Sequence, residues 1–400
     1  MGVGTIGPVL VAGAHFALSL LVWLATDAAH FGAFSFLIVL VQFSFAMLNA
    51  LAGTPLSVPP RGLGAGEVPP YRAACLQAGA LYIIAAAAVI GLICYLSALP
   101  AHWALCLLFT GTANLRWLAR SFAFALERPA VAASSDIVYV LGVGAGALLL
   151  AATDSVSVEH LLAGMTAANI LSLLICDRDF LRAQAAALSM KGLKHYLPIW
   201  QQSKWLLSGV ATTEASSNAH VYFITAAGGP TAYAPIAFAT LFFRPVSVFL
   251  MALVQLERPV LARLTEAGEL IAARRATRRG IAATLAIWLA NVALAGIVLA
   301  TVGSFIQSRG YDDGIVFPAV VLWAAIMLVR SVRTPHGTLL EARMEYRSTA
   351  AISAIVALFT VALVGALALV GALFALVGIL AGEMALAVLF ARRVRQTDHD

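Results

Sequence analysis

The residues of this sequence that could do chemistry are a small number of charges embedded in long apolar runs. Arg116, Arg120 and Arg244 each lie inside such a run. Placing an arginine in the middle of a bilayer costs about 2.5–3.5 kcal/mol, so each one needs a partner or surrounding water. The planar guanidinium can bind two phosphate oxygens at once. These three arginines therefore predict a water-filled cavity that holds a diphosphate or an acidic sugar.

Arg120 has a partner in the next apolar run. Arg120 and Asp136 lie equally far from a tight turn that joins their two runs, each roughly 9 Å deep at 1.5 Å per residue. An Arg120–Asp136 ion pair is predicted, either as a structural clasp or as part of a transport site. Arg116 lies one helical turn further along the same face, near mid-membrane, with no acid nearby in the adjoining hairpin. It is expected to be unpaired, or else to cap backbone carbonyls or pair with a distant acid.

Two further acids lie inside apolar runs. Glu214 and Arg244 both fall near the expected midplane of adjacent antiparallel helices. Glu383 lies in the last run and is expected to pair with Arg330 or Arg333. Either Glu214 or Glu383 is a candidate to carry a coupling proton, and the sequence does not choose between them.

An unusually polar segment surrounds Glu214. Residues 212–220 read Thr-Thr-Glu-Ala-Ser-Ser-Asn-Ala-His, which is a poor surface for lipid and a good wall for an aqueous cavity. Asn218 and His220 are therefore predicted to line the cavity. A helix contact rich in small polar residues would explain part of the pattern. A lone membrane histidine is also, more often than not, a packing residue.

The sequence contains no motif for covalent or metal chemistry. No phosphate-binding loop of the GxxxxGK[ST] type, no GxSxG and no HExxH is present, so we predict a protein that is not an enzyme and needs no cofactor. The four cysteines lie in or beside apolar runs with no CxxC spacing, and no metal site is expected. We interpret them as small buried hydrophobic residues: Cys75, Cys94, Cys106 and Cys176.

The elements that position these charges must be membrane helices. Hydrophobic residues make up 62% of the 400 residues and charged residues 11%, against about 45–50% and 25% in soluble proteins. Such a chain cannot cover its surface with polar groups, so its solvent must be lipid. The net charge of +6 is concentrated in loops, so the expected partners include membrane lipids and no nucleic acid.

Twelve apolar runs are long enough to cross a bilayer, which takes about 20 residues in a helix. The predicted fold class is an all-α integral membrane protein with about twelve transmembrane helices in two six-helix lobes around a central cavity. The runs are approximately 5–26, 32–57, 73–97, 101–126, 130–152, 158–176, 204–226, 231–257, 281–304, 314–334, 348–368 and 371–391.

The distribution of lysine and arginine predicts the topology. With the N-terminus inside, the inner loops and their flanking helix ends hold 21 of the 25 basic residues, and the outer loops hold one, Arg309. Basic residues favour cytoplasmic loops. Both termini are therefore expected to be cytoplasmic.

The longest polar interruption divides the chain. We predict an N-terminal lobe at 1–180, a connector at 181–203 and a C-terminal lobe at 204–400. The connector mixes basic and apolar residues, so it is expected to be an amphipathic helix on the inner leaflet, or else a simple link. Residues 231–262 weakly repeat residues 31–58, as in transporters built from two parallel six-helix repeats.

Three segments of the sequence resemble one family. Residues 115–146, LRWLARSFAFALERPAVAASSDIVYVLGVGAG, are similar to spans four and five of the polysaccharide (O-antigen-type, Wzx-like) flippases. These belong to the multidrug/oligosaccharidyl-lipid/polysaccharide exporter superfamily. Residues 30–58 and 205–264 resemble the same family, as does the twelve-span layout. The chain departs from it in a short N-terminus that lacks the basic residues often found before span one.

The resemblance implies two six-helix lobes, alternating access and export of a lipid-linked oligosaccharide. It implies a transporter of an undecaprenyl-diphosphate-linked glycan in the bacterial inner membrane, for surface or exopolysaccharide biosynthesis. Whether it works alone or beside a polysaccharide polymerase stays open. The alternatives are a cation-coupled drug exporter of the same superfamily and a membrane polysaccharide polymerase or ligase, which the short outer loops disfavour.

Overall fold

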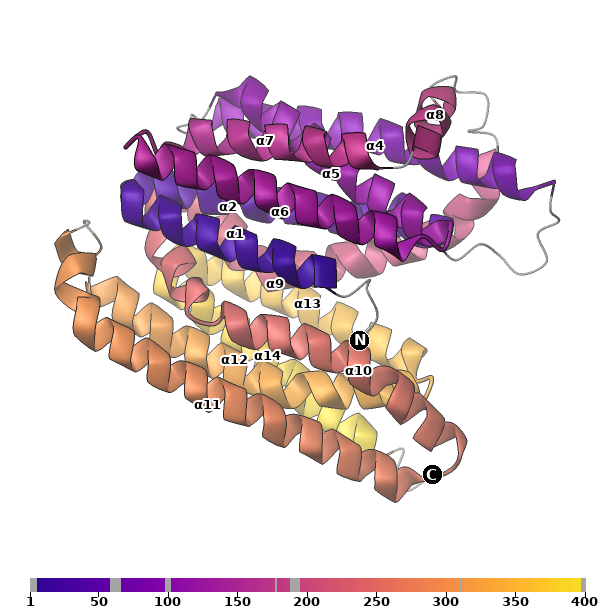
Figure 1. The fold of residues 1–400 in the computed structure, drawn as a ribbon. Helices are drawn as coiled ribbons and strands as arrows, with labels where there is room; N and C mark the ends of the chain where they lie inside the picture. Colours follow the sequence, from indigo (N-terminus) through magenta and orange to yellow (C-terminus); the bar gives the residue numbers. More distant parts are fainter. Residues whose placement is uncertain are drawn as a thin grey trace. The chain divides into compact units, whose positions relative to one another are not determined.

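A computed structural model describes residues 6–57, 66–97, 102–176, 178–187, 195–308, 311 and 313–396 of the chain. Within these ranges the regular structure is entirely helical (Figure 1), which confirms the predicted all-α class. The chain divides into two compact units, residues 1–211 and 212–400. The lobe boundaries at 180 and 204 stay predictions.

The first unit contains eight α-helices, one π-helical turn and the beginning of α9 in its described part. The elements are α1 (Ile6–Ala25), α2 (Ala28–Leu48), the π-helix η2 (Asn49–Gly53), α3 (Thr54–Ser57), α4 (Val68–Leu96), α5 (Trp103–Ala125), α6 (Pro129–Ala152), α7 (Val158–Ile175) and α8 (Arg178–Ala187).

The second unit contains the rest of α9 and the helices that follow it. They are α9 (Tyr196–Leu241), α10 (Arg244–Glu266), α11 (Leu270–Ser308), α12 (Asp313–Ala342), α13 (Tyr346–Ala368) and α14 (Ala372–Gln396). Helix α14 packs against both α12 and α13, and α12 packs against α10 and α11 as well.

Helices cover the twelve predicted spans, but the eighth, 231–257, is divided between the end of α9 and the first part of α10. Ten helices of the described ranges are long and apolar enough to cross a membrane. The other two predicted spans correspond to α5 and the first half of α9, which carry the polar residues singled out in the sequence. The cytoplasmic position of both termini stays a prediction, and Arg309 lies outside the described residues.

A proline explains the π-helical turn in the second predicted span. Pro55 has no backbone N–H, so the carbonyl of Leu51, four residues earlier, loses its helical partner. The Tyr196 hydroxyl donates to that carbonyl at 2.5 Å. The irregular turn is therefore stabilised by a side chain at the start of α9.

The predicted connector contains helix α8. Phe180 is buried against Phe122 of α5, with ring centroids 5.7 Å apart, and α8 packs against α4 as well. Residues 188–194, including Lys191, lie outside the described residues. The position of α8 at a membrane surface stays a prediction.

The seventh and eighth predicted spans meet at Gly229 inside α9. Gly229 has φ 72° and ψ −179°, a conformation essentially open to glycine alone. A second break follows at Phe242–Phe243, where the Asn291 side-chain amide donates to the Phe242 carbonyl. Arg244 becomes the first residue of α10, and Pro245 follows it in the first turn, where a missing backbone N–H is tolerated.

Candidate functional site

A single carboxylate binds both buried arginines of the first unit. Arg116 Nη1 lies 2.7 Å from Asp136 Oδ1, and Arg120 Nε lies 3.1 Å from the same oxygen. The predicted Arg120–Asp136 pair is present. The expectation that Arg116 is unpaired was wrong, because its long side chain spans the extra helical turn and reaches the same acid. All three residues are buried.

Uncharged neighbours complete this unit 1 cluster of Arg116, Arg120 and Asp136. Arg116 Nε donates to Asn169 Oδ1 of α7 at 2.9 Å, and the guanidinium carbon lies 4.0 Å from the centre of the Tyr139 ring. The Tyr139 hydroxyl in turn is hydrogen-bonded to His15 Nε2 of α1 at 2.8 Å. The cluster thus ties α1, α5, α6 and α7 together.

Helix α1 approaches the cluster at a glycine. A Cβ atom placed on Gly7 would lie 2.1 Å from Asp136 Oδ2, so a larger residue cannot occupy this position without a shift. Asp136 Oδ2 accepts no hydrogen bond from the described residues. Gly7 therefore closes the side of the carboxylate that faces away from the arginines.

The second unit contains a similar cluster on α12 and α14. Glu383 Oε1 lies 2.8 Å from Arg330 Nε, and Glu383 Oε2 lies 2.8 Å from Arg333 Nε. The prediction offered Arg330 or Arg333 as the partner, and the structure shows both. We call these three residues the unit 2 cluster. Each unit thus places two arginines against one acid.

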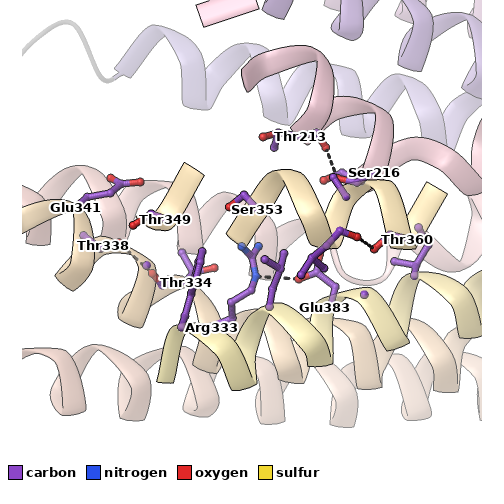
Figure 2. Close-up of a pocket in the computed structure, with 18 of the residues that line it drawn as sticks. Thr213, Ser216, Arg333, Thr334, Thr338, Glu341, Thr349, Ser353, Thr360 and Glu383 are labelled. Carbon is purple, nitrogen blue, oxygen red and sulfur yellow. Dashed lines mark hydrogen bonds and ion pairs between the residues drawn. The ribbon is translucent and has the colours of Figure 1, made fainter. Parts of the chain in front are cut away.

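The unit 2 cluster lies at a polar cavity of about 320 Å³ (Figure 2). Helices α9, α10, α12, α13 and α14 all contribute to its lining. Most of its polar groups are hydroxyls. The polar lining residues are Thr213, Ser216, Ser217, Arg333, Thr334, Thr338, Glu341, Thr349, Ser353, Thr360 and Glu383.

The polar segment 212–220 lines this cavity, but not through the residues that were predicted. Thr213, Ser216 and Ser217 share the helix face that lines the cavity. Glu214 instead accepts a hydrogen bond from Asn218 at 3.0 Å, one turn away. The sequence showed that the segment was polar, but not which face of the helix meets the cavity.

His220 is a packing residue in this structure. It is 2% exposed, and its ring lies edge-on to the Trp323 ring with centroids 5.3 Å apart. His220 does not line the unit 2 cavity, and its predicted role in substrate binding stays a prediction.

Arg244 belongs to neither cluster. It is the first residue of α10 and partly buried. In the part of the chain that the structure describes, Arg244 forms no ion pair with Glu214 or with any other acid. The predicted role of Arg244 in substrate binding stays a prediction.

The sequence did not indicate several residues that complete the two sites. Asn169 and Tyr139 hold Arg116, and Thr334, Thr349 and Ser353 line the cavity. The four-residue spacing of Thr349 and Ser353 was the available signal for a polar helix face. Within the described ranges, no group of three or more His, Cys, Asp or Glu side chains could hold a metal ion.

Comparison with known proteins shows which solved structures share the fold of this chain. No protein-family model and no curated protein matches the sequence. The lipid II flippase MurJ, in an inward closed conformation, is similar over 98% of this chain and 87% of its own, with a TM-score of 0.72 at 10% identity. An inward-facing multidrug resistance MATE family transporter covers 96% and 93%, with a TM-score of 0.66 at 11% identity. The chain has the fold of the MOP-superfamily transporters.

A third structure with this fold is a MOP-superfamily transporter from Pyrococcus furiosus. It covers 99% of this chain and 93% of its own, with a TM-score of 0.54 at 11% identity. Its description reports a binding pocket of reverse polarity that suggests a different function. The multi-pass helical architecture and the superfamily fold predicted from the sequence are thus confirmed, and the O-antigen subtype stays a prediction.

Proposed function

We propose that this protein is a membrane transporter that flips a lipid-linked oligosaccharide across the bacterial inner membrane by alternating access. The observation that carries the proposal is the excess of arginine in both units. Two arginines face one acid in the unit 1 cluster and again in the unit 2 cluster, and Arg244 adds a further cation. Guanidinium groups in such an excess suit the diphosphate of an undecaprenyl-diphosphate-linked glycan.

The fold supports the same class of function. MurJ, which shares it, is described as a lipid II flippase, and the other two structures described above are transporters. A role in surface or exopolysaccharide biosynthesis, with a polysaccharide polymerase as a neighbour in the membrane, belongs to this proposal.

A cation-coupled drug exporter is the second candidate, because a multidrug resistance transporter has the same fold. Exporters of cationic drugs need acidic side chains that attract a positive ligand. Here every buried acid of the two clusters is already bound by two arginines. The charge balance therefore favours an anionic cargo.

A flipping assay in liposomes tests the proposal. The purified protein is reconstituted with a fluorescent undecaprenyl-diphosphate oligosaccharide, and glycan at the outer leaflet is measured with a membrane-impermeant quencher. We expect quenching to exceed that of protein-free liposomes. Arg244→Gln, which leaves no acid unpaired, should slow transfer about tenfold or more, since a hydrogen bond to a charged group contributes about 1.5–3 kcal/mol.

The same liposomes separate the two candidates. Transport of a cationic dye with no transfer of the glycan would overturn the flippase and support the exporter. Arg263→Gln, at an exposed arginine on the same helix as Arg244, is the matched control and should leave transfer unchanged.

A further inference from the structure

The cavity of the second unit has one guanidinium with free terminal nitrogens. Arg333 uses Nε to contact Glu383, and its two terminal nitrogens have no partner among the described residues. Figure 2 shows this group between Ser353 and Thr334. Arg330 also contacts Glu383, and Glu341 forms an ion pair with Arg258. Three arginines thus face two glutamates, and the surplus positive charge lies at Arg333.

Three threonines that line the cavity offer hydrogen-bond acceptors. Each of these hydroxyls donates its only hydrogen to a backbone carbonyl of its own helix or of the residue before that helix. Thr338 donates to the Thr334 carbonyl at 3.1 Å, Thr349 to the Glu345 carbonyl at 2.6 Å, and Thr360 to the Val356 carbonyl at 2.7 Å. With the hydrogen engaged on the helix itself, each oxygen keeps lone pairs for a ligand. These hydroxyls therefore bind best to a ligand that brings its own donors.

This combination excludes the simplest ligands. A metal cation is disfavoured by the surplus positive charge at Arg333. A small anion such as phosphate or chloride satisfies Arg333 but offers few or no donors to the threonine oxygens. A polyhydroxylated ring that carries a carboxylate satisfies both kinds of group. The carboxylate accepts two hydrogen bonds from the guanidinium, and the ring hydroxyls donate to the threonine oxygens.

We propose that this cavity binds one sugar residue bearing a carboxylate group. The proposal rests on the proposed function, since the sugar would belong to the head group of the flipped lipid. The volume of about 320 Å³ lies at the lower end of the range for ligand pockets, about 300–1,000 Å³, so it suits a single ring rather than a whole oligosaccharide.

The first test measures binding of soluble probes to the full-length protein in lipid nanodiscs. Sodium glucuronate, glucose, sodium acetate and inorganic phosphate are titrated separately by saturation-transfer NMR. Glucuronate is expected to bind about tenfold more tightly than glucose or acetate, and phosphate is expected not to displace it. Equal binding of acetate or phosphate would show an anion site alone, and equal binding of glucose would show that the carboxylate is not recognised. Either result overturns the proposal.

Variants assign the binding to this cavity. Arg333→Lys keeps the charge but loses the two-point contact, so glucuronate should weaken about tenfold toward the affinity of glucose. Thr349→Val removes one acceptor without changing charge, so it should weaken glucuronate and glucose together and leave acetate unchanged. The matched controls are Arg263→Gln and Thr301→Val, since Thr301 is exposed and makes the same bond to its own helix. Unchanged glucuronate binding in both cavity variants would place the site elsewhere and overturn the proposal.

The flipping assay distinguishes failure of the sugar site from failure of the proposed flippase function. If wild-type protein flips the lipid-linked oligosaccharide but does not bind glucuronate, the cavity proposal is wrong and the proposed function stands. If glucuronate binds with the expected variant pattern but no glycan is flipped, the sugar site stands and the flippase function is wrong.

Discussion

At the scale of single residues, Asp136 is the group on which the two buried arginines of the first unit depend. Its carboxylate is 1% exposed and forms ion pairs with two arginines that reach it from successive turns of α5. Breaking a buried pair by removing one partner costs about 3–5 kcal/mol, because the remaining charge is left uncompensated. The stability of this unit should therefore be more sensitive to Asp136 than to any exposed acid.

The first prediction concerns the charge of this residue. Asp136→Asn should lower the free energy of unfolding by about 3–5 kcal/mol, since Arg116 and Arg120 lose their counter-charge. Thermal unfolding of the detergent-purified protein measures the effect. Asp154→Asn, in the exposed turn after α6, is the control and should unfold like the wild type. Equal melting temperatures for the two variants would show that the pair contributes nothing.

The second prediction concerns the glycine that faces the same carboxylate. Gly7→Ala should displace Asp136 or α1, because the added Cβ would lie 2.1 Å from Asp136 Oδ2. Overpacking of this kind costs about 1–3 kcal/mol. Gly13→Ala lies on the same helix, and its Cβ would meet nothing within 4 Å, so it should be neutral or slightly stabilising. Indistinguishable unfolding of the two variants would contradict the close approach.

For single residues, the sequence predicts a contact from the depth of each side chain in the membrane, counted in residues from the end of its helix. Arg120 and Asp136 lie at equal depth on helices joined by a short turn, so their pairing was predictable. Arg116 and Asn169 were not, because depth says nothing about how far a long side chain reaches or which third helix packs alongside. The same limit explains why Ser216 lines the cavity and Asn218 does not.

At the scale of helices, close packing of α13 on α14 shapes the unit 2 cavity. Gly378 and Gly382 are four residues apart on α14, the spacing that allows two membrane helices to approach closely. A Cβ on Gly378 would lie 2.8 Å from Val364 Cγ2, and one on Gly382 would lie 2.1 Å from Thr360 Oγ1.

The third prediction tests this contact. Gly378→Ala should separate α13 from α14 and lower the free energy of unfolding by about 1–3 kcal/mol. Gly296→Ala on α11 has open space around its Cβ and is the matched control. Chemical unfolding followed by tryptophan fluorescence would show the difference. A Gly378 variant as stable as the control would mean that the two helices are not in tight contact.

The fourth prediction concerns the turn that joins α12 to α13. Glu345 in this turn accepts hydrogen bonds from Arg393 of α14 at 2.8 and 3.0 Å. Its hydrogen bond with Ser348 and its contact with Arg393 hold the pKa of Glu345 below its usual value of 4.5. Because the pKa is lowered in the folded state, the pair stabilises the protein at neutral pH. That contribution is lost as the pH falls through the lowered pKa.

Glu345→Gln should therefore melt at a lower temperature than the wild type at pH 7, and the gap should close as the pH falls from 4.5 through the lowered pKa. Glu266→Gln, at the exposed end of α10, is the control and should melt like the wild type at pH 7. A gap for Glu345→Gln that persists unchanged at low pH would rule out the ionised pair as its cause.

The sequence predicted where the helices lie better than where they break. Apolar run length placed a helix at each of the twelve ranges, since crossing a bilayer requires it. The π-helical turn at Asn49–Gly53 depends on Tyr196, which is far away in sequence and supplies the missing donor. The break before Arg244 likewise depends on Asn291. Such long-range hydrogen bonds cannot be derived from local pattern.

At the scale of the whole molecule, the orientation in the membrane is the prediction that most needs a direct measurement. The four native cysteines are all buried, so the chain has a low background for labelling single introduced thiols. The turn after α6 lies in a predicted outer loop, and the turn after α10 lies in a predicted basic inner loop. The two turns are therefore expected on opposite sides of the membrane.

The fifth prediction uses single cysteines introduced into these two turns. In right-side-out membrane vesicles, Asp154→Cys should react with a membrane-impermeant maleimide, and Ala267→Cys should react only after the vesicles are opened. Both positions are exposed in turns between helices. The opposite pattern would invert the topology and place both termini outside. The unmodified chain controls for reaction at the native cysteines.

The recurrence of two arginines against one acid in each unit has an electrical consequence. With the acids ionised, each cluster carries one net positive charge into the membrane-embedded part of its unit. Moving one elementary charge through the full field of a 100 mV potential involves about 2.3 kcal/mol of work. Any transition that shifts either cluster along the membrane normal is therefore voltage-dependent. An inside-negative potential pulls both clusters toward the cytoplasm.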